Sequence, residues 1–89
     1  MKIFKYPLEY KDGIQEVELP DCTNVICVHH QISRPCIWAE VYEVHDNAPV
    51  TRRFEVFPTG VRLPLDLVYI GTVFPLNAQQ VYHIYEHTS

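Results

Sequence analysis

Seven prolines are spread along this 89-residue chain, at positions 7, 20, 35, 49, 58, 64 and 75. They leave no proline-free interval longer than 14 residues. Proline interrupts a helix because it has no backbone N–H and its ring clashes with the preceding turn. A long amphipathic helix therefore has little room in the chain, and the sequence is expected to fold from strands and turns.

The segments between the turn residues have the composition of β-strands. Along residues 52–57, Phe54 and Val56 share a face with Arg52, while Arg53 and Glu55 share the other face. Short strands at regular spacing predict an all-β fold, a small sandwich or a partly closed barrel of about six to seven strands. The predicted strands cover residues 2–9, 15–19, 24–32, 36–44, 52–57, 67–74 and 80–86.

Turn residues and apolar runs suggest how these strands pair. Residues 11–13 contain Asp12-Gly13, a strong hairpin signal, so the first two strands are expected to pair with each other. Loops are expected over residues 46–49, 58–60 and 77–79, with Gly60 free to adopt a positive φ. The continuous apolar run 25–28 predicts a central strand.

Size and composition predict one domain over residues 1–89. The chain is 47% hydrophobic and 20% charged, as folded globular proteins are. A domain near this size buries only about 60–65% of its unfolded-chain surface, so its core is thin and a homo-oligomer, most simply a dimer, is expected. No apolar run approaches the roughly 20 residues that span a bilayer, and residues 1–13 lack the apolar region of a signal peptide. A cytoplasmic protein without membrane contact is expected.

Charge and cysteine content exclude several function classes. The net charge of −4 is opposite to the basic surface that nucleic-acid binding requires, so no nucleic-acid partner is expected. The three cysteines, Cys22, Cys27 and Cys36, are odd in number and lack C-x-x-C spacing. They are expected to be reduced structural thiols.

Two histidines near the C-terminus, His83 and His87, stand four residues apart with Glu86 beside the second. In a strand the two share a face but lie about 13 Å apart. One ion cannot bind both, because its nitrogen ligands lie about 2 Å away. The sequence therefore predicts no metal and no cofactor, although a site built from His30, His83 and an acidic residue across the fold stays open as an alternative.

A ligand site is expected at the Thr59-Gly60 turn, because backbone N–H groups at a glycine turn can bind an anion. Arginine can add charge-assisted hydrogen bonds, and an aromatic ring can stack on a base. The candidate ligand-binding residues are Arg53, Thr59, Gly60, Arg62, Tyr69 and Trp38. Gly71, inside a predicted strand, indicates a bulge or a close approach by a ligand or another segment. A plain turn at Gly60 and a plain bulge at Gly71 are the simpler alternatives.

Five short motifs occur in order along the chain: FKYPLE at 4–9, PCIWAEV at 35–41, PTG at 58–60, YIGT at 69–72 and VYHIYE at 81–86. Together they resemble a family of small uncharacterised phage and prophage proteins with the pattern W-K-Y-P-L, C-L-W-A, G-T-G, Y-I-G-T and V-x-H-V-F-E. This chain has Phe4 in place of the tryptophan and Pro58 in place of the first glycine of G-T-G. The resemblance implies an accessory gene expressed inside a bacterium and carries no activity.

Three functions follow from these observations. The leading hypothesis is a non-enzymatic phage accessory protein in the bacterial cytoplasm, acting in counter-defence by binding a host protein or sequestering an anionic nucleotide signal. The first alternative is a structural or assembly module of a phage. The second is a small hydrolase with a His/Glu site, although the sequence contains no G-x-S-x-G, P-loop or H-E-x-x-H motif.

Overall fold

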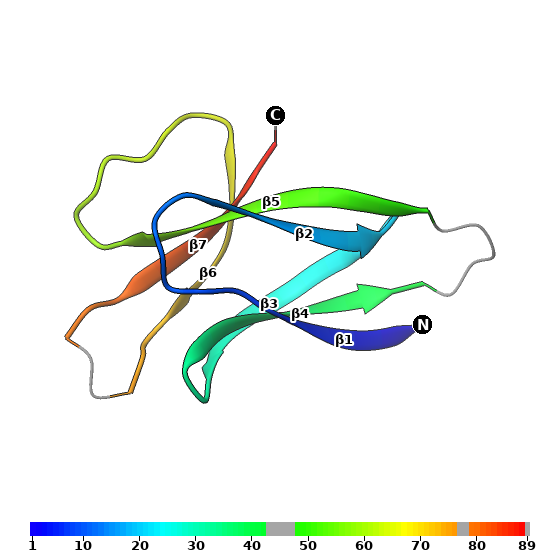
Figure 1. The fold of residues 1–89 in the computed structure, drawn as a ribbon, viewed down its shortest axis with the longest axis horizontal. Helices are drawn as coiled ribbons and strands as arrows, with labels where there is room; N and C mark the ends of the chain where they lie inside the picture. The colour runs from blue at the N-terminus through cyan, green and yellow to red at the C-terminus, as the bar shows by residue number, and fades with distance from the viewer. Residues whose placement is uncertain (43–47, 77–78, 89) are drawn as a thin grey trace.

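The computed structural model describes residues 1–42, 48–76 and 79–88, and within them the chain forms seven strands and no helix (Figure 1). This confirms the predicted all-β fold. No helix in these ranges could therefore span a membrane. The strands are β1 (Lys2–Pro7), β2 (Ile14–Pro20), β3 (Asn24–Gln31), β4 (Arg34–Val41), β5 (Pro49–Pro58), β6 (Leu67–Val73) and β7 (Tyr82–His87).

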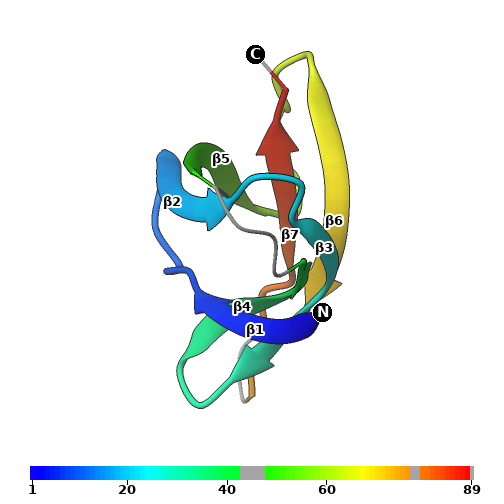
Figure 2. The same cartoon turned by 90° about the vertical axis from the view of Figure 1, so that its right-hand side faces the viewer.

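The strands form two antiparallel sheets. One has three strands in the order β1-β4-β3, and the other has four in the order β2-β5-β7-β6. Figure 2 shows the four-stranded sheet curving around the three-stranded one, so that β6 comes to lie beside β3. The result is a sandwich-like fold and not a closed barrel.

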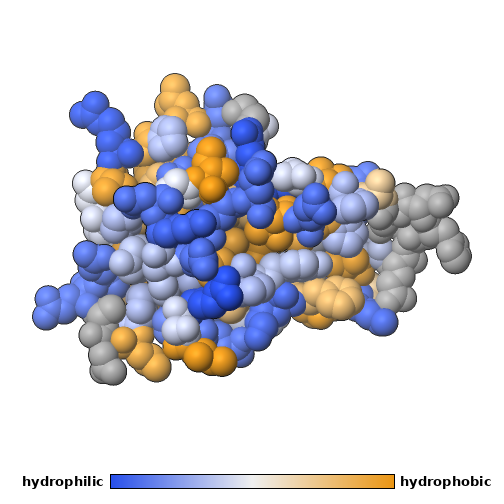
Figure 3. All heavy atoms as spheres, viewed as in Figure 1, coloured by the Kyte–Doolittle hydropathy of each residue, from blue (hydrophilic) through white to orange (hydrophobic). Residues whose placement is uncertain are grey.

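The core lies between the sheets and is small. Phe54 and Val56 of β5 face it, as their alternation predicted. On the side seen in Figure 3, hydrophobic residues are visible in the seam between β2 and β1, so the sandwich is not fully covered along this edge. The buried core cluster consists of Leu8, Leu19, Val28, Ile37, Phe54, Val56, Val73 and Ile84.

The predicted pairing of the first two strands is wrong. β1 pairs with β4 instead, from Lys2 opposite Val41 to Pro7 opposite Cys36, and β2 pairs with β5. Leu8 follows β1 and is buried in the core, so the chain has already begun to cross between the sheets before it reaches Gly13. Gly13 does adopt a positive φ of 93°, but a turn fixes only the local path of the chain and not the strand that it pairs with.

The apolar run at residues 25–28 is not a central strand. It lies in β3, at the edge of the three-stranded sheet, while the central strand is β4, whose Ile37 and Ala39 are fully buried. The pairing of β3 with β4 shifts between Val25 and Cys27, and Ile26 at this bulge is 45% exposed. The extra residue of the bulge explains why four consecutive apolar residues fit an edge strand.

The interpretation of Gly71 as a bulge or a close approach is confirmed on both counts. The pairing of β6 with β7 shifts between Tyr69 and Gly71. A Cβ on Gly71 would lie 2.6 Å from Cγ1 of Val28, so the neighbour that comes close is a side chain of β3. The missing side chain lets the edges of the two sheets meet.

Three strand starts, at residues 2, 24 and 67, match those predicted, and the other boundaries differ by one to three residues. β4 begins at Arg34, earlier than the predicted residue 36, because it extends to the tight turn that joins it to β3. Residues 43–47 lie outside the described residues. They include the predicted end of this strand, His45 and part of the predicted loop 46–49. Residues 77–78 of the predicted loop 77–79 lie outside the described residues as well.

Candidate functional site

The face of the four-stranded sheet that points away from the core carries three neighbouring aromatic side chains. Val56 and Ile84 face inward, so Phe57 and Tyr85 lie on the other face of the sheet, where Phe57 is only 7% exposed, and Tyr69 lies directly opposite Tyr85. The ring centroids of Tyr85 lie 5.9 Å from Phe57 and 5.4 Å from Tyr69, and both pairs meet edge to face. We call Phe57, Tyr85 and Tyr69 the aromatic row. Edge-to-face contacts stabilise such a row by about 0.5–1.5 kcal/mol per pair.

A chain of hydrogen bonds runs beside the aromatic row and centres on His83. The hydroxyl of Thr72 lies 3.0 Å from Nδ1 of His83, and the hydroxyl of Thr59 lies 2.8 Å from Nε2. Thr59 Oγ1 also donates to the carbonyl oxygen of Val81 at 3.1 Å, and the Tyr69 hydroxyl lies 2.6 Å from Thr72 Oγ1. Residues from two strands and one loop are joined in this way.

One assignment of hydrogens satisfies the whole chain. Because the single hydrogen of the Thr59 hydroxyl goes to Val81, Thr59 must accept from Nε2–H of His83. Neutral His83 then accepts from Thr72 at Nδ1, and Thr72 accepts from the Tyr69 hydroxyl. Every ring nitrogen and hydroxyl hydrogen of the chain is used, so His83 is held in one tautomer and Tyr69 in one orientation.

A shallow pocket of about 230 Å³ opens at the Phe57 end of the aromatic row. Small-molecule sites usually enclose about 300–1,000 Å³, so this pocket suits a group the size of one side chain. It is lined by Phe57, Pro58, Thr59, Gly60, Val61, Leu63, His83 and Tyr85. None of these lining residues carries a carboxylate, an ammonium or a guanidinium group.

Three of the six candidate ligand-binding residues gather at this face. Thr59 and Gly60 line the pocket, and Gly60 adopts the positive φ that its turn requires, at 98°. Tyr69 joins the same network through Thr72 and His83. The role of His83 here was missed in the sequence, because its hydroxyl partners lie 24 and 11 residues away and no spacing rule connects them.

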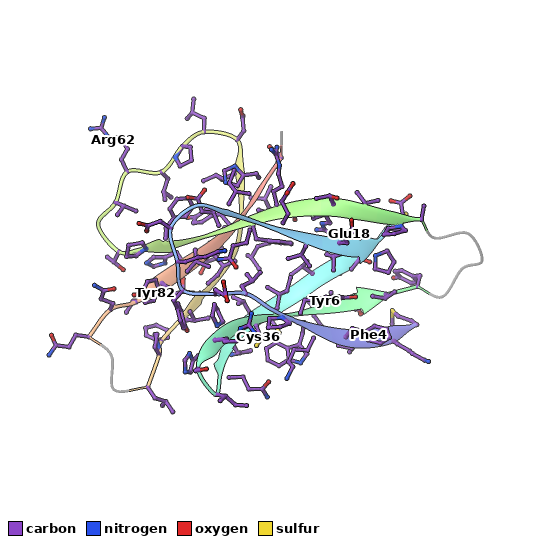
Figure 4. The ribbon with its side chains drawn as sticks, viewed as in Figure 1. Phe4, Tyr6, Glu18, Cys36, Arg62 and Tyr82 are labelled. Carbon is purple, nitrogen blue, oxygen red and sulfur yellow. The ribbon has the colours of Figure 1, made fainter. Side chains whose placement is uncertain are left out.

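The other three candidates do not line this pocket. The side chain of Arg62 extends from the loop at residues 59–66 away from the rest of the molecule (Figure 4). Arg53 lines a separate open pocket of about 460 Å³, and five strand residues lie between it and Thr59, a span of about 20 Å. Trp38 belongs to the other sheet, where its ring meets the edge of His29 at 6.0 Å. The structure therefore does not assemble an arginine, the glycine turn and the tryptophan into one site.

The neighbouring Arg52 has a structural role. Its Nε and Nη2 donate to the two carboxylate oxygens of Glu86 at 2.6 and 2.7 Å, and Nη1 donates to the Thr23 carbonyl at 2.6 Å. The hydrogen bond to Glu86 raises the pKa of Arg52 against the opposing effect of burial. The interpretation that Arg52, and not Arg53, shares the inner face with Phe54 and Val56 agrees with this contact.

The histidines at the C-terminal end engage separate partners. His87 Nε2 lies 2.8 Å from Glu55 Oε1, whereas His83 bonds only to threonines. His30 lies 2.6 Å from the hydroxyl of Tyr10 through Nδ1. Among residues 1–42, 48–76 and 79–88, no cluster of three histidine, cysteine or acidic side chains has the arrangement to hold a metal ion.

The fold and this face define a class: a small two-sheet β-sandwich domain with shallow, open pockets. The full chain, residues 1–89, matches the family model described as a domain of unknown function (DUF7352). The protein belongs to that family. Neither the curated proteins nor the solved structures gave a significant match to the chain.

Proposed function

We propose that this protein is a non-enzymatic binding protein that holds a protein partner against the aromatic row and the loop at residues 59–66. The resemblance to phage and prophage proteins supports a setting inside a bacterium, where the partner would be a host protein and the role counter-defence. The observation that carries the proposal is the group of exposed apolar side chains on this loop, next to a pocket that Phe57 and Tyr85 line.

The loop contributes most of this exposed apolar surface. Val61 and Leu63 are exposed at the pocket, Leu65 is 88% exposed, and Tyr69 in the next strand is 55% exposed. Exposed apolar side chains gathered on one part of a surface mark interaction sites, and tyrosine is enriched in them. One side chain of a partner, seated in the pocket of about 230 Å³, would act as the anchor of such an interface.

The hydrogen-bonded chain through His83 prepares this face for binding. Thr59, Thr72 and Tyr69 are all oriented by it before any partner arrives. Ordering a side chain at an interface costs about 0.5–1.5 kcal/mol, so a face that is already ordered retains more of its contact energy. The uncharged pocket lining also favours an apolar or aromatic anchor over a phosphate.

Comparative capture from bacterial lysate, with quantitative mass spectrometry, tests the proposal. Leu65→Ser alters the proposed face, and Ile3→Ser is the matched control, because Ile3 is an exposed apolar residue of β1 in the other sheet. A specific partner should be retained by the control and lost by Leu65→Ser, with affinity reduced about 30-fold or more for an anchoring contact. Equal retention by both variants would contradict the proposed surface.

The site of contact can be mapped independently. A photo-crosslinker placed at Tyr69 should capture the same partner, whereas one placed at Glu18, an exposed position at the other edge of the four-stranded sheet, should not. Crosslinks from Glu18 alone would place the interface elsewhere. A second candidate function, capture of an anionic small molecule, is favoured by a different part of the molecule.

A further inference from the structure

A second pocket lies where the chain crosses between the sheets. Residues 9–11 face the turn that joins β3 to β4, and between them is an open pocket of about 440 Å³. This volume is within the range of small-molecule sites. The pocket is lined by Glu9, Tyr10, Lys11, Ser33 and Arg34, and we call it the crossover pocket. It shares no lining residue with the pocket beside the aromatic row.

The backbone on one side of the crossover pocket is firmly held. Leu8 donates from its backbone N–H to the Pro35 carbonyl at 2.7 Å, which extends the pairing of β1 with β4. The side chain of Gln15 accepts from the Glu9 N–H at 2.8 Å and donates to the Glu9 carbonyl at 2.7 Å. This part of the backbone is therefore fixed before a ligand binds, and the ordering cost falls on the side chains.

Arg34 is oriented in the crossover pocket by its own backbone contact. Its Nε donates to the Leu8 carbonyl at 2.9 Å, and this leaves the N–H groups of Nη1 and Nη2 for other acceptors. The nearest carboxylate oxygen, Oε1 of Glu9, is 3.9 Å from Nη2. A charge-assisted hydrogen bond is normally about 2.7–2.9 Å long, so Arg34 lacks a close anionic partner in Glu9.

Lys11 likewise lacks a close anionic partner in Glu9. Its Nζ lies 3.5 Å from Oε2 of Glu9, so two cations share one loosely placed carboxylate. By comparison, the ion pair between Arg52 and Glu86 has an N–O distance of only 2.6 Å. The lining of the crossover pocket consequently carries a net charge of +1 (Lys11 and Arg34 against Glu9), in a chain whose net charge is −4.

Tyr10 forms the uncharged wall of the crossover pocket. Its ring stacks on His30 at 5.7 Å and tilts against Tyr82 at 4.7 Å, and its hydroxyl lies 2.6 Å from His30 Nδ1. Burial, followed by the nearby Tyr82 and Cys36, raises the pKa of Tyr10. The phenol therefore adds no negative charge. Asp12 does not line the crossover pocket; it lines an adjoining pocket of about 170 Å³ that shares Tyr10 and Lys11 with it.

We propose that the crossover pocket binds the phosphoryl group of a phosphate-bearing small molecule. The Nη groups of Arg34 supply a planar fork that matches two phosphate oxygens, Lys11 supplies a second positive charge, and the Ser33 hydroxyl supplies a neutral donor. Glu9 acts as the internal competitor that the phosphate displaces from both cations. This inference does not depend on the proposed protein partner, because the two sites share no residue.

The test is titration of the full chain with inorganic phosphate, pyrophosphate and adenosine monophosphate, at constant ionic strength, followed by calorimetry and by amide chemical shifts. Shifts are expected at residues 9–11 and 33–34. Lys11→Ala and Arg34→Ala should each weaken binding about ten- to a hundredfold, the usual loss for one charged hydrogen bond. Arg62→Ala removes the same charge from the exposed loop and should leave the affinity unchanged.

Removal of the internal competitor provides a test in the opposite direction. Glu9→Gln should tighten phosphate binding several-fold, whereas Glu18→Gln, the matched control on β2, should not. Glu9→Gln keeps the two hydrogen bonds between the Glu9 backbone and the Gln15 side chain, so it still tests the proposal if Arg34→Ala fails to fold. Tighter binding of adenosine monophosphate than of phosphate would identify a larger phosphorylated ligand, and equal binding would identify phosphate itself.

Two results would overturn the proposal. The first is that none of the three probes binds at millimolar concentration. The second is that Arg62→Ala weakens binding as much as Lys11→Ala does, which would show attraction by general surface charge. Failure here is distinct from failure of the proposed protein contact, because Lys11→Ala should still capture the partner and Leu65→Ser should still bind phosphate.

Discussion

The side chain of Val28 packs against the backbone of Gly71, so that the edge strands β3 and β6 lie close together. A methyl group at Gly71 would lie 2.6 Å from Val28 Cγ1, well inside van der Waals contact. This contact joins the two sheets at the edge opposite to the chain crossing.

Gly71→Ala is expected to lower the free energy of unfolding by about 1–3 kcal/mol, because overpacking a buried contact costs that much. Val28→Ala alone should also be destabilising, since it removes two buried methyl groups. The double variant should be more stable than the sum of the two losses predicts, because each change makes room for the other. Urea denaturation measures all three, and strictly additive losses would contradict the contact.

Ile32 is a second specific target. It occupies the turn between β3 and β4 with a φ of 61°, and its side chain is 90% exposed. A left-handed conformation costs an L-residue roughly 1–2 kcal/mol, and asparagine tolerates it better than isoleucine. Ile32→Asn should therefore raise the free energy of unfolding by about 1 kcal/mol. Ile3→Asn, an exposed change in β1, should bring no such gain, and a destabilised Ile32→Asn would refute the turn geometry.

The ion pair of Arg52 with Glu86 should be among the costliest polar contacts to break. Both side chains are mostly buried, and the two charges make two direct hydrogen bonds. Arg52→Ala leaves Glu86 without its partner inside the fold, so a loss of about 2–4 kcal/mol is expected. Arg53→Ala, one residue away on the outer face, should cost less than about 1 kcal/mol. Thermal and urea denaturation at neutral pH compare the two.

Tyr10 should make stability fall at alkaline pH. Burial raises its pKa in the folded state, so the folded protein retains the phenolic proton at a pH where the unfolded chain has lost it. The stabilisation is complete below about pH 10, the ordinary tyrosine value, and is lost as the pH rises through the higher folded-state pKa. Melting temperatures from pH 8 to 11 should fall less steeply in Tyr10→Phe. An equal or steeper fall in that variant would contradict the assignment.

We expect the protein to be a dimer in solution. Phe4 of β1 and Val50 of β5 are 44% and 41% exposed, although both share the strand face of core residues, and hydrophobic residues show in the seam of Figure 3. A second copy would cover this seam, and two-fold pairing is the commonest arrangement. Light scattering should give twice the monomer mass of 10.4 kDa, and Phe4→Glu should give the monomer mass. A monomeric wild-type protein at micromolar concentration would exclude the dimer.

Local chemistry was sufficient to predict the strands and two of the special backbone positions, but not the positive φ of Cys22, Ile32 and Asp66. Proline spacing excluded long helices, alternation placed Phe54 and Val56 inward, and Gly60 and Gly71 proved to be a positive-φ turn and a bulge. These features depend on each residue and its immediate neighbours in the chain, through steric limits on φ and the two-residue period of a strand. The sequence therefore determined the fold class and most strand boundaries to within a few residues.

Tertiary structure alone decided which strands pair and which residues meet. β1 pairs with β4 and not with the next strand, β2, because the chain crosses from one sheet to the other at the buried residue Leu8. The free energy gained by burying Leu8 cannot be read from a turn motif. Arg53 and Gly60 lie far apart because the extended strand β5 separates them. Residues 9–11, by contrast, lie across the crossover pocket from Ser33 and Arg34. Pairing and assembly of this kind depend on contacts between distant segments, and the free energy of those contacts is fixed only when both sheets close on one core.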